Sequence, residues 1–227
     1  MSRLAPRILA LVGLSMAASG CLQPAMAETA VKTPAATVTS HDTGKRETAI
    51  FAGGCFWGVE AVFSHVKGVT SAVSGYAGGA RGTANYDTVS GGDTGHAESV
   101  RVTWDPSVVR YDQLLQIYFS VVADPTLLNR QGPDIGSQYR SALVPLNAEQ
   151  ARVAKAYVAQ LGKAGLWSRP IVTRIEPFRG FYAAEAHHQD FAARNPDHGY
   201  IRRWDVPKVA AFKTGYPSFY KSAFTTG

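Results

Sequence analysis

The sequence predicts an α+β domain in which helices pack on a mixed β-sheet, and two observations support this class. Short apolar runs with strand-like spacing are interleaved with segments whose apolar residues recur at helical spacing. The order strand, helix, strand, strand, helix, strand, helix, strand, helix is typical of one sheet covered by helices. With 227 residues, 45% of them hydrophobic, the chain can bury one sizeable core.

The expected elements end in a proline-containing segment. Strands are expected over residues 48–52, 69–76, 96–104, 138–144 and 171–175. Helices are expected from Cys55 to the residue before Gly68, over 114–122, over 147–161 and over 181–193. Pro196, Pro207 and Pro217 argue against one long element after this point. Residues 195–227 are therefore predicted to form an irregular C-terminal arm packed on the domain.

The first 27 residues have the pattern of an export signal. Arg3 and Arg7 precede a short apolar run, residues 8–18, and Ala25-Met26-Ala27 fits a small-residue cleavage site. The apolar run is too short to cross a bilayer. We therefore predict an exported, periplasmic protein with a signal peptide over 1–27, a flexible spacer over 28–46 and a catalytic domain over 47–194.

A second processing hypothesis competes with this cleavage. Ala18-Ser19-Gly20-Cys21 resembles the lipobox of bacterial lipoproteins, in which the cysteine is acylated. The protein would then be anchored to a membrane through Cys21. Cleavage after Ala27 is preferred because Ala18 stands where the lipobox usually has Leu.

The charge of the chain is mildly basic. Its formal net charge is +6 at pH 7, and removal of Arg3 and Arg7 with the signal lowers it to +4. The basic residues are scattered rather than clustered, so they indicate solvated faces and no nucleic-acid interface.

The stretch Gly53-Gly54-Cys55 lies where a buried strand turns into a helix. The two glycines permit the sharp reversal, and the first turn of a helix favours an anion, which should make the Cys55 thiol easier to ionise. The alternative, a small buried hydrophobe, leaves the glycines unexplained. Cleavage after Ala27 would leave Cys55 as the only cysteine, so no second thiol of the chain could resolve its oxidised form.

Glu98 lies on the same face of the expected strand as Val100, Val102 and Trp104. At the end of a buried face, desolvation would raise the pKa of its carboxyl. The pattern leaves two alternatives open, namely an edge side chain in water and an ion pair with Arg101 or another base.

Two tyrosines are candidates by position. Tyr86 lies in a long loop, residues 80–95, and Tyr139 opens the strand that follows the polar loop 129–137. Each tyrosine could pack its ring in the core or present its hydroxyl to a ligand, and the sequence leaves both alternatives open.

A thiol at such a turn suits acyl transfer as well as redox chemistry. A cysteine hydrolase or acyltransferase would need a histidine base, which five histidines leave formally open: His65, His96, His187, His188 and His198. A Cys-x-x-Cys oxidoreductase is excluded because the second cysteine is missing. The scattered histidines show no ligand spacing, so no metal site is expected.

Four motifs in register carry a resemblance to a known family. They are Gly53-Gly54-Cys55-Phe56-Trp57-Gly58, Gly75-Tyr76-Ala77-Gly78-Gly79, Gly95-His96-Ala97-Glu98, and Asn129-Arg130-Gln131-Gly132-Pro133-Asp134 with Gln138-Tyr139-Arg140-Ser141. Over residues 48–194 the chain resembles peptide methionine sulfoxide reductase A, which reduces the S epimer of methionine sulfoxide. The fold that this resemblance implies is a two-layer α/β sandwich with a mixed sheet.

The resemblance implies that Cys55 is the nucleophile that attacks the sulfoxide sulfur, leaving methionine and a Cys55 sulfenic acid. Glu98 would be the acid on the sulfoxide oxygen, and Tyr86 and Tyr139 would be the two phenols that share this oxygen. Asp134 would lie in the polar part of the pocket.

The resemblance also assigns Phe56 and Trp57 to an aromatic wall for the substrate S-methyl group. Many family members carry resolving cysteines near the C-terminus, whereas residues 221–227 have none, and Ser90 stands where some members have a cysteine. The chain therefore resembles a one-cysteine type with no bound cofactor. Its partners would be oxidised proteins, free methionine sulfoxide and an external thiol reductant, either thioredoxin-like or glutathione/glutaredoxin-like.

Overall fold

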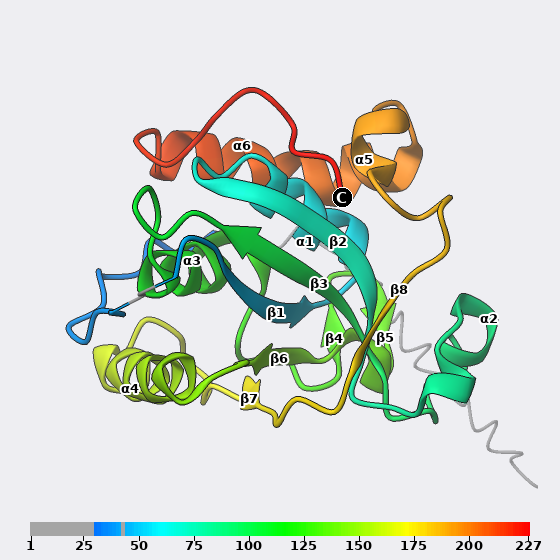
Figure 1. Ribbon diagram of the computed structural model, residues 1–227, viewed down its shortest axis with the longest axis horizontal. Coiled ribbons are helices and arrows are strands. Elements are labelled where there is room, and N and C mark those ends of the chain that lie inside the picture. The colour runs from blue at the N-terminus through cyan, green and yellow to red at the C-terminus, as the bar shows by residue number, and fades with distance from the viewer. Residues whose placement is uncertain (1–29, 42–43) are drawn as a thin grey trace, which may run out of the picture.

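A six-stranded sheet organises the computed structural model, which describes residues 30–41 and 44–227. The strand order is β7-β6-β1-β3-β2-β8 (Figure 1). The strands are β1 (Glu47–Gly53), β2 (Val69–Ala77), β3 (Ala97–Trp104), β6 (Ser141–Val144), β7 (Arg174–Ile175) and β8 (Phe181–Ala183). β6 and β7 pair in parallel and the other neighbours are antiparallel, so the predicted mixed sheet is confirmed. A separate hairpin joins β4 (Arg130–Gln131) to β5 (Asp134–Ile135).

The helices pack around the sheet. They are α1 (Phe56–Ser64), α2 (Tyr86–Val89), α3 (Tyr111–Ile117), α4 (Ala148–Ala164), α5 (Phe191–Arg194) and α6 (Val206–Gly215). Figure 1 shows α1 and α6 together beside β2, α4 near β6 and β7, α3 between α6 and α4, and α2 standing apart from the sheet. π-Helical turns extend α3 over Tyr118–Val122 and precede α6 over Ile201–Asp205. No helix of the described ranges is long and apolar enough to span a bilayer.

The centre of the sheet and α1 form the core that positions the site. β1 lies between β3 and β6, which explains its continuous apolar run. α1 packs on β2 and β3 and against α6, and all of its residues except Trp57 are buried. The rings of Phe51 and Phe63 lie 4.6 Å apart between strand and helix. The segment that carries the candidate nucleophile is therefore held on both sides by packed elements.

The helix predicted over residues 181–193 is wrong. Residues Phe181–Ala183 form β8, which pairs with β2, and only Phe191–Arg194 are helical, as α5. Asp190 has φ 53° and interrupts any continuous helix before α5. Hydrogen bonding to the edge of β2 that β3 leaves open thus overrides the helical spacing of this segment.

The prediction of an irregular C-terminal arm is also wrong. Residues 201–215 are helical throughout, and Pro207 is accommodated because it lies just after the π-helical turn Ile201–Asp205, where the regular hydrogen-bond ladder is interrupted. Phe212 of this helix is fully buried in the main core. The segment after residue 194 is therefore part of the domain.

The spacer predicted over 28–46 is packed where the structure describes it. Thr33 is 2% exposed, and its Oγ1 donates to the carbonyl oxygen of Gln116 at 3.2 Å. The Ser40 backbone N–H donates to Asp112 Oδ1 at 3.0 Å. Residues 30–41 thus form an extended segment bound to α3 and its neighbours. The predicted signal peptide and Cys21 lie outside the described residues.

Candidate active site

The strand-to-helix turn depends on Gly54. Its φ is 89°, and a Cβ at this position would lie 2.6 Å from Cβ of Gln131. Any other residue would therefore be strained and would collide with the β4–β5 hairpin. The turn makes Cys55 the N-cap of α1, at the junction of strand and helix.

The thiol of Cys55 is half-buried among carboxyl groups. Burial raises its pKa well above the usual value, and the charges of Glu98, Asp205 and Asp134 act in the same direction. The backbone N–H of Trp57 donates to the sulfur and opposes these effects. The prediction of a more easily ionised thiol is therefore wrong for the free protein, because burial and three carboxyl groups outweigh the helix N-terminus.

The Glu98 carboxyl contacts the residue that follows Cys55, and its charge acts on the thiol. Glu98 is 2% exposed on β3, as the strand parity predicts, and its Oε2 accepts the Phe56 N–H at 3.0 Å. Burial raises its pKa to about 8, partly offset by that hydrogen bond, and the charge of Asp134 raises it further. The two open alternatives are excluded, since Glu98 is buried and the guanidinium of Arg101 lies over the Phe181 ring at 4.9 Å. At neutral pH Glu98 is mainly a protonated donor.

The structure brings both candidate tyrosines to the same site. Tyr86 begins α2, and Tyr139 ends a 3₁₀ turn, Ser137–Tyr139, rather than opening the strand, which begins at Ser141. Burial raises the pKa of each phenol, and the charge of Glu98 is the next cause for both. Both hydroxyls therefore remain protonated donors beside Glu98.

Long-range hydrogen bonds hold the loop that carries Tyr86. The Tyr86 N–H donates to Glu185 Oε1 at 2.9 Å, and Tyr76 O–H donates to Glu185 Oε2 at 2.8 Å. At the other end of the loop, Gln138 Nε2 donates to the carbonyl oxygen of Ser90 at 3.0 Å. The turn of Tyr139 and the loop of Tyr86 are thus tied together.

A third tyrosine completes the polar side of the site. Tyr200 O–H donates to Asp134 Oδ2, which joins the C-terminal segment to β5. Burial raises the pKa of this phenol, followed by the charge of Cys55. The sequence does not single out Tyr200, because it lies in the segment predicted to be an irregular arm. The pocket at Cys55 is lined by Cys55, residues 131–134, Tyr200, Trp204, Asp205 and Lys208.

The two predicted wall residues differ in exposure. Phe56 has no exposed surface, so its ring lies in the core beneath the site, 5.2 Å from the His188 ring. Trp57 is half-buried, stacks on Phe191 at 3.8 Å, and donates from Nε1 to Nδ1 of His188 at 3.3 Å. Trp57 is therefore the aromatic side chain of this pair that can touch a ligand.

Two other kinds of chemistry find little support in the described parts of the chain. No group of three or more His, Cys, Asp or Glu side chains there could hold a metal ion. Among these residues, no hydrogen bond joins a histidine to the Cys55 thiol, whose pKa is shifted by burial, three carboxyls and the Trp57 N–H.

Comparison with known proteins identifies the family. Residues 47–218 match the family model described as peptide methionine sulfoxide reductase. The chain is 59% identical over 174 residues to a Mesorhizobium japonicum protein named peptide methionine sulfoxide reductase MsrA 2, covering 77% of this chain and 89% of that protein. It is 50% identical over 171 residues to the MsrA of Deinococcus radiodurans, covering 75% and 82%.

Solved structures agree with these relatives. Reduced Mxr1 from Saccharomyces cerevisiae superposes with a TM-score of 0.58 at 32% identity, covering 71% of this chain and 92% of that one. Methionine sulfoxide reductase A of Corynebacterium diphtheriae gives a TM-score of 0.57 at 30% identity, covering 77% and 85%. With the thiol, the acid and the phenols in one site, this chain belongs to the peptide methionine sulfoxide reductase family, whose members reduce methionine sulfoxide.

Proposed function

We propose that this protein reduces methionine S-sulfoxide, free or within proteins, through a Cys55 sulfenic acid that an external thiol then reduces. The observation that carries the proposal is the pairing of the Cys55 thiol with a protonated carboxyl, Glu98, behind the N-terminus of α1. A nucleophile and a proton donor at one sulfoxide are what this reduction requires.

The first half-reaction begins with the sulfoxide oxygen facing Glu98, Tyr86 and Tyr139. Because the Phe56 N–H occupies Oε2 of Glu98, the proton is available on Oε1. Three O–H donors then stabilise the charge that develops on the oxygen as sulfur is attacked. Raised pKa values keep all three protonated at neutral pH.

Cys55 Sγ forms a bond to the substrate sulfur while Glu98 transfers its proton to the sulfoxide oxygen. The thiol proton passes to the Glu98 carboxylate, which restores the acid. The hydroxyl then moves to Sγ as the sulfur–sulfur bond breaks. The substrate sulfur gains two electrons, Sγ loses two, and the products are methionine and the Cys55 sulfenic acid.

The second half-reaction needs a thiol from outside the described residues. One thiol attacks Sγ and releases water, which gives a mixed disulfide, and a second thiol attacks that disulfide and frees Cys55. A thioredoxin-like or glutaredoxin-like protein would supply these thiols. The support is that the printed sequence has only two cysteines, Cys21 and Cys55.

A single-turnover reaction tests the proposal. The protein without reductant is mixed with methionine S-sulfoxide, and methionine formed and free thiol remaining are counted. One methionine per protein with loss of the Cys55 thiol is expected. An intact thiol with no methionine would refute the sulfenic-acid cycle.

The proposed location is the periplasm, with cleavage after Ala27. Its support is the basic, apolar and small-residue pattern of residues 1–27. Sequencing of the protein isolated from its natural source should find Glu28 at the N-terminus. A chain that begins at an acylated Cys21 would show the lipid-anchored alternative instead.

A further inference from the structure

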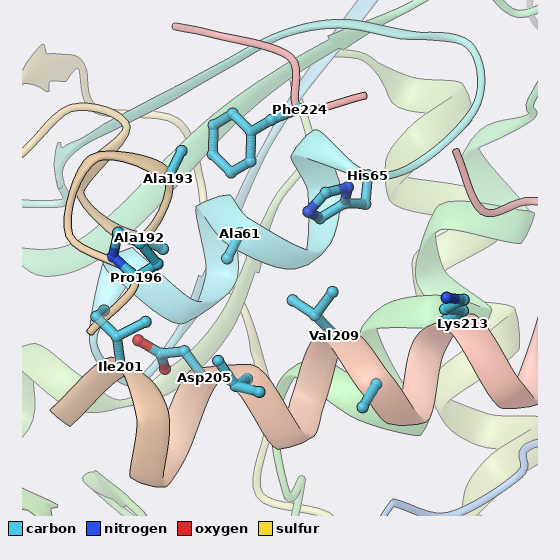
Figure 2. Close-up of a pocket in the computed structure, with 12 residues that line it drawn as sticks. Ala61, His65, Ala192, Ala193, Pro196, Ile201, Asp205, Val209, Lys213 and Phe224 are labelled. Atoms are coloured by element: carbon cyan, nitrogen blue, oxygen red, sulfur yellow. The ribbon is translucent and has the colours of Figure 1, made fainter. Parts of the chain in front are cut away.

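An apolar groove runs along α1 beside the Cys55 pocket. Its walls come from α1, the α5 region and α6, and its volume is about 260 Å³. Figure 2 shows Ala61 of α1 and Val209 of α6 facing each other across it, with Ala192 and Pro196 near one end and Lys213 near the other. A cavity of about 150 Å³ holds one benzene ring, so the groove has room for one or two apolar side chains.

The groove lies next to the pocket at Cys55, and one buried residue forms part of the wall of both. Asp205 lines both the groove and the Cys55 pocket. Tyr200 lines the Cys55 pocket, whereas the next residue, Ile201, lines the groove. A Cβ added to Gly58 would lie 2.3 Å from Asp205 Oδ1, which places this shared wall against the first turn of α1.

On this basis, and resting on the proposed function, we propose that the groove binds an apolar side chain of the oxidised polypeptide near its methionine sulfoxide. Ala61 and His65 lie six and ten residues beyond Cys55, which corresponds to about 9 and 15 Å along the helix axis. An extended peptide advances about 3.3 Å per residue. The apolar residue therefore lies about three to five positions from the sulfoxide.

The groove gives the enzyme a preference among oxidised proteins. Burial of one leucine side chain in the groove contributes favourable binding energy. Part of that energy is offset by ordering the peptide, so the expected gain in kcat/KM is about tenfold. Free methionine sulfoxide does not reach the groove and gains nothing.

The test uses N-acetylated peptides with one methionine S-sulfoxide and dithiothreitol as the reductant. One set has leucine three, four or five positions before or after the sulfoxide, and the other has serine at the same position. In the wild-type protein, at least one leucine peptide should exceed its serine partner about tenfold in kcat/KM. Equal values for all pairs would overturn the inference.

Ala210→Glu places a carboxylate on the exposed rim of the groove. This variant should lose the leucine preference and reduce N-acetyl methionine sulfoxide at the wild-type rate. Ala159→Glu, at an equally exposed helical position on α4, is the matched control and should keep the preference. Ala193→Glu, on the opposite wall, repeats the test if the first variant folds poorly.

Two further outcomes distinguish a peptide-binding groove from a reductant-docking groove and from an inactive protein. If Ala210→Glu keeps the leucine preference and raises only the KM for thioredoxin, the groove docks the reductant and the inference is overturned. If the wild-type protein fails to reduce N-acetyl methionine sulfoxide, the proposed function itself fails. Reduction of that compound without any leucine preference overturns the groove proposal alone.

Discussion

The two halves of the site are built in different ways. Cys55 and Glu98 lie on the central sheet and its first helix, where the Phe56 N–H joins them at 3.0 Å. Tyr86 and Asp134 lie on a short helix and a two-residue strand, held by Glu185 and Tyr200 from distant parts of the chain. We therefore expect the sheet half to dominate the sulfur chemistry, whereas the peripheral half positions the substrate and places the Tyr86 hydroxyl at its oxygen.

The largest effect should come from the sheet half. Cys55→Ser removes the nucleophile, so methionine formation in a single turnover should fall more than about 1,000-fold. The free energy of unfolding should stay within about 1 kcal/mol of the wild type, since the two side chains are similar in size. Methionine formation at the wild-type rate would show that this sulfur is not the reacting group.

Glu98→Gln should lower the single-turnover rate about 100-fold, because the proton donor is lost. In the wild type the rate should decline as pH rises through about 8, where Glu98 loses its proton. The variant should lack this decline. Rates are measured by rapid quench from pH 6 to 9.

Glu60→Gln is the matched control for this prediction. Glu60 is fully buried in α1, its pKa is also about 8 because of burial, and its Oε2 accepts the Asp190 N–H at 3.0 Å. Both glutamates have a pKa above the usual 4.5, so each stabilises the fold below about pH 4.5 and loses this contribution as pH rises towards 8. Both variants should flatten the fall in stability, but only Glu98→Gln should change the rate profile. Equal rate losses would mean that Glu98 has a structural role only.

A smaller effect is expected in the peripheral half. Tyr200→Phe removes the hydroxyl that donates to Asp134, so KM for N-acetyl methionine sulfoxide should rise about tenfold. The kcat should stay within about threefold of the wild type, which steady-state assays with dithiothreitol can show. A fall in kcat at unchanged KM would break the division between the two halves.

The smallest effect concerns the support of Tyr86. Glu185→Gln keeps one acceptor oxygen, whereas the carboxylate serves both the Tyr86 N–H and the Tyr76 O–H. The kcat/KM for the same substrate should fall about threefold, with no change in the stability of the main core by thermal unfolding. An unchanged kcat/KM would show that the other end of the loop, bound through Gln138, is sufficient.

The same division between the two halves separates the site residues that could be predicted from the sequence from those that could not. Cys55 and Glu98 could be predicted from local patterns. Cys55 stands where a strand turns into a helix, and Glu98 lies on the buried face of an alternating strand. Tyr200 and His188 act on partners 66 and 131 residues away, and no local spacing reveals such contacts. The prolines near Tyr200 indicate breaks in the chain, although Pro207 lies within a helix, just after its π-helical turn.

The predicted ionisation of the thiol has the wrong sign for a related reason. The helix N-terminus is visible in the sequence, but the opposing carboxyls come from β3, β5 and the π-helical turn before α6. Their approach to Cys55 is a property of the folded domain. The fold class is confirmed because it rests on β1, β2, β3 and β6 and on the helices between and after them, and these elements follow the predicted order.

The neutral state of Cys55 has a consequence for survival of the enzyme itself. Oxidants and alkylating reagents react with thiolates far faster than with thiols. Because burial and neighbouring carboxyls raise the pKa of the Cys55 thiol, we expect oxidants to attack it more slowly than an ionised thiol. On this expectation, the nucleophile reacts fastest when a sulfoxide is in place to accept a proton.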